Sequence, residues 1–226
     1  LHSASTEYLT YQFVHGKRGA AAMSAPQSVL PQFKGIGVHD CWASYFRFSG
    51  MRHAICNAHI LRELTGIIEN NQSRWGWRMK RLLLEMYVKS NGGKGVIEQV
   101  GRYEQRYRKI LDVAEREEPP PERVNQKGKL KRTKGRNLLE RLRKYEEAVL
   151  LFAKEQAVPF TNNQAERDIR PAKVKQRVTG GFRAASGSEN YSRIQSFIST
   201  LRKQKRQVFE ELLSVIVGNP FELFQS

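Results

Sequence analysis

A chain of 226 residues, of which 39% are hydrophobic, can bury one substantial core, so disorder is not the default. Its 39 Lys and Arg against 22 Asp and Glu give a formal net charge of +17, which predicts a polyanionic partner, because neutralising phosphates releases counterions. No apolar run approaches the roughly 20 residues of a membrane-spanning helix, and no signal peptide opens the chain. Two cysteines imply no disulfide framework. We therefore expect a cytoplasmic protein without a membrane partner.

Short strands and turns are predicted for the first part of the chain. Residues 9–13 alternate apolar and polar side chains, which is the period of a half-buried strand, and residues 3–6 are expected to form a hairpin turn. An apolar strand at residues 36–38 ends in His39 and Asp40. An acid at a strand exit is well placed for chemistry.

From residue 57 the hydrophobic period becomes that of a helix. Apolar side chains spaced by three, four and seven residues predict four helices between residues 57 and 155. The third of them is expected over residues 96–114, and the fourth over residues 138–149. A Pro-rich and basic stretch at 117–136 predicts a loop between the third and the fourth. One or two further helices are expected over residues 188–217. This order of strands and helices predicts a mixed α/β protein in which helix predominates.

The segment VPFTNNQAERDIRPAKVKQRVTGGFR, at residues 158–183, places Glu166 at the start of a short helix rich in cations. Thr161, Asn162 and Asn163 can cap this helix, and the helix dipole favours an acid in its first turn. Glu166 could therefore be a capping residue on a solvated helix. Alternatively it could hold a metal, because an acid among phosphate-binding bases is typical of metal-dependent phosphoryl transfer on nucleic acid. The bases one, four and seven residues later are Arg167, Arg170 and Lys173.

Zinc-binding residue types occur around a short strand expected at residues 53–56. His53, Cys56 and His59 follow Cys41, but their spacing is looser than that of zinc knuckles. The alternative is structural histidines and a buried thiol where a strand joins a helix, and the loose spacing favours it.

Four separated segments resemble the transposases of the insertion-sequence-sixty-six family, and they occur in order over nearly the whole chain. The segments are VHDCWASY at 38–45, HAICNAHILREL at 53–64, the stretch at 158–183, and SRIQSFISTLRKQ at 192–204. The resemblance implies a ribonuclease-H-like mixed sheet with a large helical insertion, and a DDE triad that binds two Mg²⁺ ions. By position, Asp40 matches the second acid of the triad and Glu166 matches the third, so both are expected to be catalytic metal ligands.

The resemblance also implies a path for DNA lined by basic side chains. Lys173 matches the lysine that follows the glutamate after six intervening residues in many such enzymes, where it would contact the transposon end. The residues assigned to the path are Arg167, Arg170, Lys173, Lys175, Arg177, Arg183 and Arg193. The residues assigned to structural support of the site are His39, Asn162 and Asn163.

Three parts are expected in this organisation. Residues 1–56 form the first part of the ribonuclease-H-like core, residues 57–155 form the helical insertion with its basic loop, and residues 156–226 contain the glutamate helix and basic C-terminal helices. The family's first aspartate lies on a strand that would fall upstream of Leu1. The sheet is therefore predicted to lack its first strand.

These observations predict a DDE transposase that cuts DNA at the ends of an insertion sequence and joins the strand to target DNA. Its partners would be double-stranded transposon ends and target DNA, bound by a homo-oligomer at the bacterial nucleoid. Accessory proteins are further candidate partners. The alternative is a catalytically inactive DNA-binding remnant, because the first catalytic aspartate is absent from this chain. An RNA-binding protein is disfavoured, because the aromatic residues are scattered over helical faces.

Overall fold

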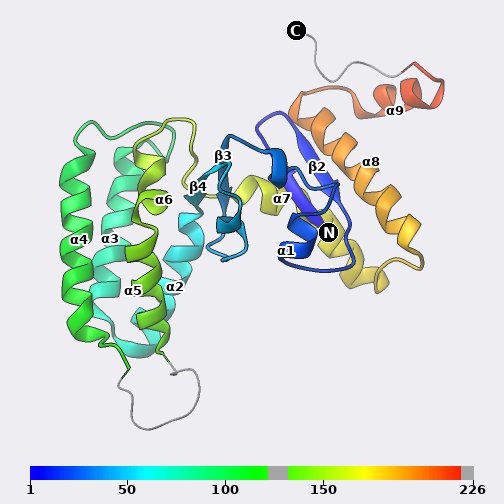
Figure 1. Ribbon diagram of the computed structural model, residues 1–226. Helices are drawn as coiled ribbons and strands as arrows, with labels where there is room; N and C mark the ends of the chain where they lie inside the picture. Colours follow the sequence, from blue (N-terminus) through cyan, green and yellow to red (C-terminus); the bar gives the residue numbers. More distant parts are fainter. Residues whose placement is uncertain (122–131, 220–226) are drawn as a thin grey trace. The chain divides into compact units, whose positions relative to one another are not determined.

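The computed structural model describes residues 1–121 and 132–219, and their contacts divide the chain into two compact units. The central unit is Phe33–Asn162, and the terminal unit combines Leu1–Gln32 with Asn163–Ser226. About 59% of the structure is helix, and the described strands form two small sheets (Figure 1). The predicted α/β class with predominant helix is therefore confirmed, while the three-part division of the sequence stays a prediction.

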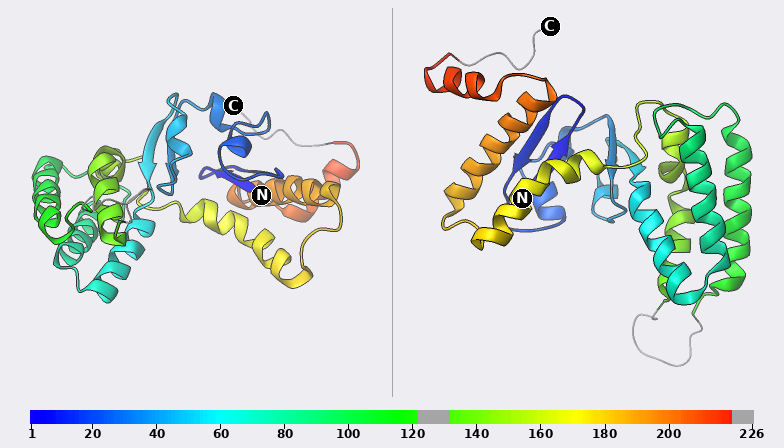
Figure 2. Two further views of the ribbon diagram at one scale, coloured as in Figure 1. Left: turned by 60° about the horizontal axis from the view of Figure 1, so that its bottom comes forward. Right: turned by 180° about the vertical axis from the view of Figure 1, so that it is seen from behind.

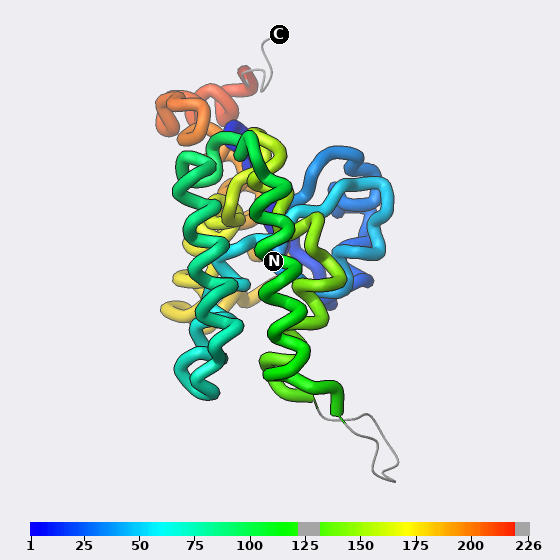
Figure 3. The backbone as a smooth tube through the Cα atoms, turned by 90° about the vertical axis from the view of Figure 1, so that its left-hand side faces the viewer, coloured from blue at the N-terminus to red at the C-terminus, as the bar shows by residue number. Residues whose placement is uncertain are grey.

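The central unit joins a small sheet to a helical block. Strands β3 (Ile36–His39) and β4 (Arg52–Ile55) pair in parallel. The helices and 3-10 turns of this unit are η2 (Tyr45–Arg47), α2 (Asn57–Asn71), α3 (Arg74–Lys89), α4 (Val100–Glu117), α5 (Lys134–Lys144), α6 (Glu146–Leu150) and η3 (Leu151–Ala153). Helices α3 and α4 stand side by side (Figure 3). Much of the predicted loop at 117–136, namely residues 122–131, lies outside the described residues.

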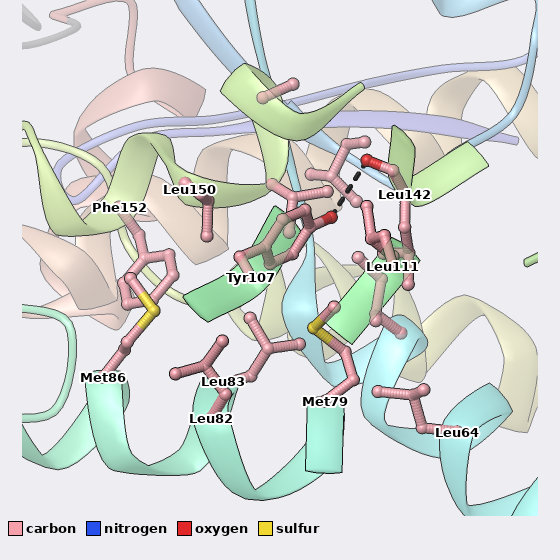
Figure 4. Close-up of a cluster of buried hydrophobic side chains, with 14 of the residues drawn as sticks. Leu64, Met79, Leu82, Leu83, Met86, Tyr107, Leu111, Leu142, Leu150 and Phe152 are labelled. Atoms are coloured by element: carbon pink, nitrogen blue, oxygen red, sulfur yellow. Dashed lines mark hydrogen bonds between the residues drawn. The ribbon is translucent and has the colours of Figure 1, made fainter. Parts of the chain in front are cut away.

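Apolar side chains at helical spacing build the core of the central unit (Figure 4). Tyr107 of α4 is fully buried, and its hydroxyl donates a hydrogen bond to the Leu142 carbonyl oxygen at 2.9 Å, so its one polar atom is satisfied. Burying a large apolar side chain contributes about 1.5–3 kcal/mol. The other labelled side chains around it are Leu64, Met79, Leu82, Leu83, Met86, Leu111, Leu150 and Phe152.

The predicted helix boundaries need two corrections in this block. The third helix begins at Val100, whereas the apolar pattern predicts a start near Val96, which is 51% exposed and not part of the core. The fourth predicted helix is two helices, α5 and α6, separated at Tyr145. Tyr145 stacks on Phe46 with ring centroids 3.9 Å apart, a contact remote in sequence that the periodicity of the helix does not report.

The terminal unit contains a hairpin and the remaining helices (Figure 2). Its antiparallel strands are β1 (His2–Ser5) and β2 (Thr10–Phe13). Its helices are α1 (Ala20–Met23), η1 (Leu30–Gln32), α7 (Asn163–Thr179), α8 (Ala185–Lys203) and α9 (Val208–Ile216). Gly180 and Gly181 connect α7 to α8 with φ angles of 72° and 121°, a left-handed backbone that favours glycine.

The hairpin differs from the sequence prediction in two respects. Residues 3–6 are mostly strand, and the turn lies just after them, closed by the Thr6 N–H donating to the Leu9 carbonyl at 2.9 Å. In β2 the polar side chains face inward: Thr10 and Gln12 are 5% and 2% exposed, whereas Tyr11 is 40% exposed. The alternation is real, but its buried face is the polar one.

Helix α8 explains this inversion, because it covers β2 with hydroxyl groups. The Thr10 N–H donates to Thr200 Oγ1 at 3.1 Å, and the Gln12 N–H donates to Ser196 Oγ at 2.8 Å. Ser199 Oγ lies 2.9 Å from Thr10 Oγ1. A strand edge with unpaired N–H groups invites association, and these hydroxyls satisfy that edge of β2 from within the unit.

Candidate functional site

Asp40 follows the last residue of β3 in the central unit. Its Oδ1 accepts a hydrogen bond from the Trp42 N–H at 3.3 Å, which holds the carboxylate at the start of the turn after the strand. The preceding strand residue, His39, is anchored to β4 by its carbonyl, which accepts from the Cys56 N–H at 2.8 Å. Asp40 is only partly buried at this end of the sheet.

His39 supports this strand end from inside the unit. Its ring stacks on Tyr45 at 4.3 Å, its Nδ1 contacts the Asp40 carbonyl oxygen, and its Nε2 lies 3.0 Å from Nδ1 of His53. Burial lowers the pKa of His39 to about 4, against the opposing effect of the hydrogen bond to the Asp40 carbonyl. A neutral His39 that donates from Nδ1 must accept at Nε2, so His53 Nδ1–H is the donor between the two rings.

Asn57, the first residue of α2, links the start of that helix to residues 149 and 160 near the end of the central unit. Its N–H donates to the Phe160 carbonyl at 2.9 Å, and its fully buried amide donates to the Val149 carbonyl at 3.0 Å. Nearby, the Asn162 N–H donates to Cys56 Sγ at 3.3 Å. The predicted supporting residue Asn162 thus packs against the strand-to-helix join that follows β4.

Glu166 lies in the first turn of α7 in the terminal unit, as the sequence predicts. The helix begins at Asn163, directly after Asn162, and Glu166 is partly buried. An acid in this turn is favoured by the helix dipole. Asp40 and Glu166 belong to different units, so their meeting at one metal site stays a prediction.

Asp168, two residues after Glu166, is the hydrogen-bonding centre of the terminal unit. Its Oδ2 accepts from Ser5 Oγ at 2.5 Å, Thr10 Oγ1 at 2.9 Å and Lys203 Nζ at 2.7 Å. Its Oδ1 accepts from Gln164 Nε2 at 2.9 Å. The single side chain therefore joins α7 to both strands of the hairpin and to the end of α8.

The Asp168–Lys203 ion pair is buried, with side chains 6% and 8% exposed. Lys203 Nζ also donates to the carbonyls of Thr6 and Leu9 at 2.9 and 2.8 Å, so each of its three N–H groups has an acceptor. Burial raises the pKa of Asp168, but the hydrogen bonds from Lys203, Ser5 and Thr10 outweigh it, and the pKa falls below its ordinary value. The Lys203 side chain, on the polar face of α8, is therefore turned into the unit and not toward solvent.

Sequence reasoning did not find this pair, although one signal for it was present. Along α8, the hydroxyl side chains of Ser192, Ser196 and Thr200 recur every four residues, and Lys203 follows after three more. A helix face that repeats hydroxyls where a core helix repeats leucines indicates packing against polar groups. Asp168 supplies the negative charge that pairs with Lys203 at the end of this face.

The basic residues assigned to a DNA path all belong to the terminal unit, on α7, on α8 and in the turn between them. All but Lys175 are exposed. Lys175 Nζ lies 5.4 Å from the ring centroid of Phe182 and 5.3 Å from that of Tyr191, so this cation is held against two aromatic faces. These side chains therefore lie on two consecutive helices and the turn between them, and their binding to DNA stays a prediction.

A zinc site finds no support in the described residues. Within residues 1–121 and 132–219, no group of three or more His, Cys, Asp or Glu side chains is placed to hold a metal ion. Cys56 is buried and accepts a backbone hydrogen bond, and His53 contacts His39. This arrangement fits the alternative of structural histidines and a buried thiol.

Within residues 1–121 and 132–219, no helix has the length and apolar content needed to span a bilayer.

Comparison with known proteins gives one match. The family model described as "Transposase IS66 family" matches residues 1–190, which include β1 to α7 and the first turns of α8. No curated protein and no solved structure matches the chain. The matched range contains both Asp40 and Glu166.

Proposed function

The chain belongs to the IS66 family of transposases and has a function related to transposition. We propose that it cleaves DNA strands at the ends of an insertion sequence and transfers them to target DNA. The observation that supports this proposal best is the placement of the two acids. Asp40 follows a strand end that His39 and its neighbours hold in place, and Glu166 lies in the first turn of a helix whose exposed side chains include Arg167, Arg170, Lys173 and Arg177. At both positions, the end of a strand and the first turn of a helix, a carboxylate could coordinate a metal ion that also binds a phosphate.

Asp40 and Glu166 supply hard oxygen donors of the kind that Mg²⁺ takes. Asp40 fits this role, because only its Oδ1 enters a hydrogen bond among the described residues, which leaves Oδ2 for a ligand. Two Mg²⁺ ions, when bound, would activate the attacking water or 3′-hydroxyl and stabilise the leaving oxygen. In this proposal the chain's own residues orient the two carboxylates, with His39, Asn162 and Asn163 as support.

A ribonuclease-H-like fold is part of the proposal. It is supported by the antiparallel pair β1–β2, the parallel pair β3–β4 and the helices α2 to α6, which lie in the sequence between the two acids. In this reading the helical block is the predicted insertion at residues 57–155.

DNA is the proposed partner, bound through phosphates by the basic residues of α7 and α8. Arg170, Lys173 and Arg177 follow Glu166 at intervals of four, three and four residues, which places all of them along one face of α7. Side chains on the same face as the carboxylate would hold the backbone of the strand beside the reacting phosphate. Assembly as a homo-oligomer on two DNA ends, and a location at the nucleoid, belong to the same proposal.

The test is strand cleavage of the element's own terminal DNA in Mg²⁺, compared between Asp40→Asn, Glu166→Gln and two matched controls. The controls are Asp112→Asn, an exposed acid paired with Arg143, and Glu189→Gln, an exposed acid of α8. Loss of a metal ligand should lower the cleavage rate about a thousandfold or more and leave DNA binding intact. The controls should cleave like the unmodified protein.

An inactive DNA-binding remnant is the second candidate, because the exposed basic residues of α7 and α8 could bind phosphates without any metal. The same assay separates the two. A protein that binds the terminal DNA tightly but cleaves no faster than the Glu166→Gln variant, in Mg²⁺ or Mn²⁺, would be such a remnant. Cleavage that survives both substitutions would reject the assignment of the two acids.

A further inference from the structure

Helix α3 of the central unit carries an exposed stripe of cationic and aromatic side chains, which we call the arginine stripe. It consists of Arg74, Trp77, Arg78 and Arg81. Intervals of three, one and three residues place all four on one side of a helix. All four are exposed, including Trp77, whose surface is 53% accessible.

The stripe is not part of the hydrophobic core. Trp75, two residues before Trp77, is fully buried, and Met79 and Leu83 are buried with it against α2 and α4. The two tryptophans of α3 therefore point in different directions, one into the core and one to solvent. A large aromatic side chain exposed among cations is a candidate contact for a partner.

None of the three arginines of the stripe forms an ion pair within the described residues, although the charge of Arg81 helps to lower the pKa of Glu85. Arg106 and Arg108 of the same unit, in contrast, pair with Glu85 and Glu146 at 2.7 Å. Three arginines are therefore available to an anionic partner.

Glu117 is the acid placed at the start of the stripe, and it is used by the backbone. Its Oε2 accepts from the N–H groups of Arg74 and Trp75 at 3.1 and 3.2 Å. Ser73 caps the same helix by accepting from the Gly76 N–H at 3.1 Å. The helix N-terminus is thus already occupied, and any anion here must be held by the arginine side chains.

The aromatic ring and the cations form one surface. The Arg81 guanidinium lies 5.4 Å from the centre of the Trp77 ring. A surface hollow beside it is lined by Arg74, Trp77 and Arg78, together with Ile68, Gln72 and Ser73. Guanidinium groups bind phosphate oxygens in a bidentate manner, and indole rings pack on sugars and bases, so this combination suits a nucleic-acid strand.

We propose that the arginine stripe of α3 is a DNA-binding surface, which grips phosphates with Arg74, Arg78 and Arg81 while Trp77 packs against the neighbouring sugar or base. This proposal rests on the proposed function in taking DNA as the partner. It adds a contact made by the helical block of the central unit, remote in sequence from the basic helix α7. The chain would then hold DNA through both of its units.

The test measures binding of the full chain to a 30-base-pair duplex at several NaCl concentrations. The variant Arg74→Ala/Arg78→Ala/Arg81→Ala is compared with Arg106→Ala/Arg108→Ala/Arg143→Ala, which removes the same charge from ion-paired arginines of the same unit. Each lost phosphate contact lowers the slope of log affinity against log salt by about 0.9. We expect a decrease of about two to three for the stripe variant, with tenfold or greater loss of affinity near 0.1 M salt, and less than one for the control.

A third variant, Trp77→Leu, tests the aromatic contact. It should weaken binding about fivefold or more and leave the salt slope unchanged, because stacking releases no counterions. Equal slopes for the two triple variants would overturn the proposal, since net charge alone would explain them. If the unmodified chain does not bind DNA, the proposed function fails with it. If it binds and the stripe variant keeps the full slope, only the stripe is rejected.

Discussion

The largest buried side chains of the central unit are apolar, Trp75, Phe152 and Leu83 among them, whereas the side chains buried between β2 and α8 of the terminal unit are polar. Thr10, Gln12 and Thr200 occupy positions where a leucine would be usual. Hydrophobic packing is non-directional and tolerates small shifts, whereas a hydrogen-bond network is satisfied in one geometry only. The unit that carries Glu166 therefore depends on directional bonds as well as on buried apolar side chains such as Met23 and Leu201.

The difference predicts distinct responses to mutation. In the central unit, stability should depend on the volume of the side chain removed. In the terminal unit, it should depend on whether a buried polar group loses its partner. The predictions below test this distinction, and amide hydrogen exchange resolved by segment assigns each effect to one unit.

The largest effect is expected in the hydrophobic core. Phe152→Ala empties space between buried side chains and should lower the free energy of unfolding by about 4 kcal/mol. Exchange should accelerate in α2 to α5 and remain unchanged in the β1–β2 hairpin. The control is Phe209→Ala, since Phe209 is 79% exposed and its loss should change stability by less than about 0.5 kcal/mol.

Asp168→Ala should lower the stability of the terminal unit by about 3 kcal/mol, because it leaves Lys203 buried without its counter-ion. Urea titration followed by exchange in β1, β2 and α8 measures this. The matched control is Asp112→Ala, which breaks an exposed ion pair and should change stability by less than about 1 kcal/mol. Unchanged exchange in the hairpin of the Asp168 variant would show that the network does not hold the unit together.

Thr200→Val keeps the shape of the side chain but removes the hydroxyl that serves Thr10. The expected loss is about 1–2 kcal/mol, because the buried Thr10 N–H is left without an acceptor. Nuclear magnetic resonance should show faster exchange at the Thr10 amide in particular. Thr179→Val, at an exposed position near the end of α7, is the isosteric control and should have little effect.

The smallest effect should come from a surface ion pair of the central unit. Hydrogen bonds from Arg106 lower the pKa of Glu85, so the folded chain holds the ionised form more strongly than the unfolded chain. The pair's stabilisation should be present above the unfolded pKa near 4.3 and disappear as pH falls through the lower folded value. Glu85→Gln should lower stability by about 0.5 kcal/mol at pH 7 and by nothing measurable at pH 2. An equal loss at both pH values would exclude ionisation as the cause.

The sequence by itself determined the helical block, the strand before Asp40 and the helix that begins before Glu166. In each case the signal is local. Apolar residues at helical spacing must face one side whatever they pack against, and an acid in a first turn is favoured by the helix it belongs to. The family was also visible in the sequence, since four short segments carried it in order.

Only the tertiary structure decided which face of β2 is buried and which acid organises the terminal unit. Asp168 meets Ser5 and Lys203 across 163 and 35 positions of the chain, and a polar side chain is buried only if such remote partners satisfy it. The division of α5 from α6 at Tyr145 likewise accompanies a ring contact with Phe46. Periodicity reports how a segment alternates, but the partner that the segment meets determines whether its apolar or its polar side turns inward.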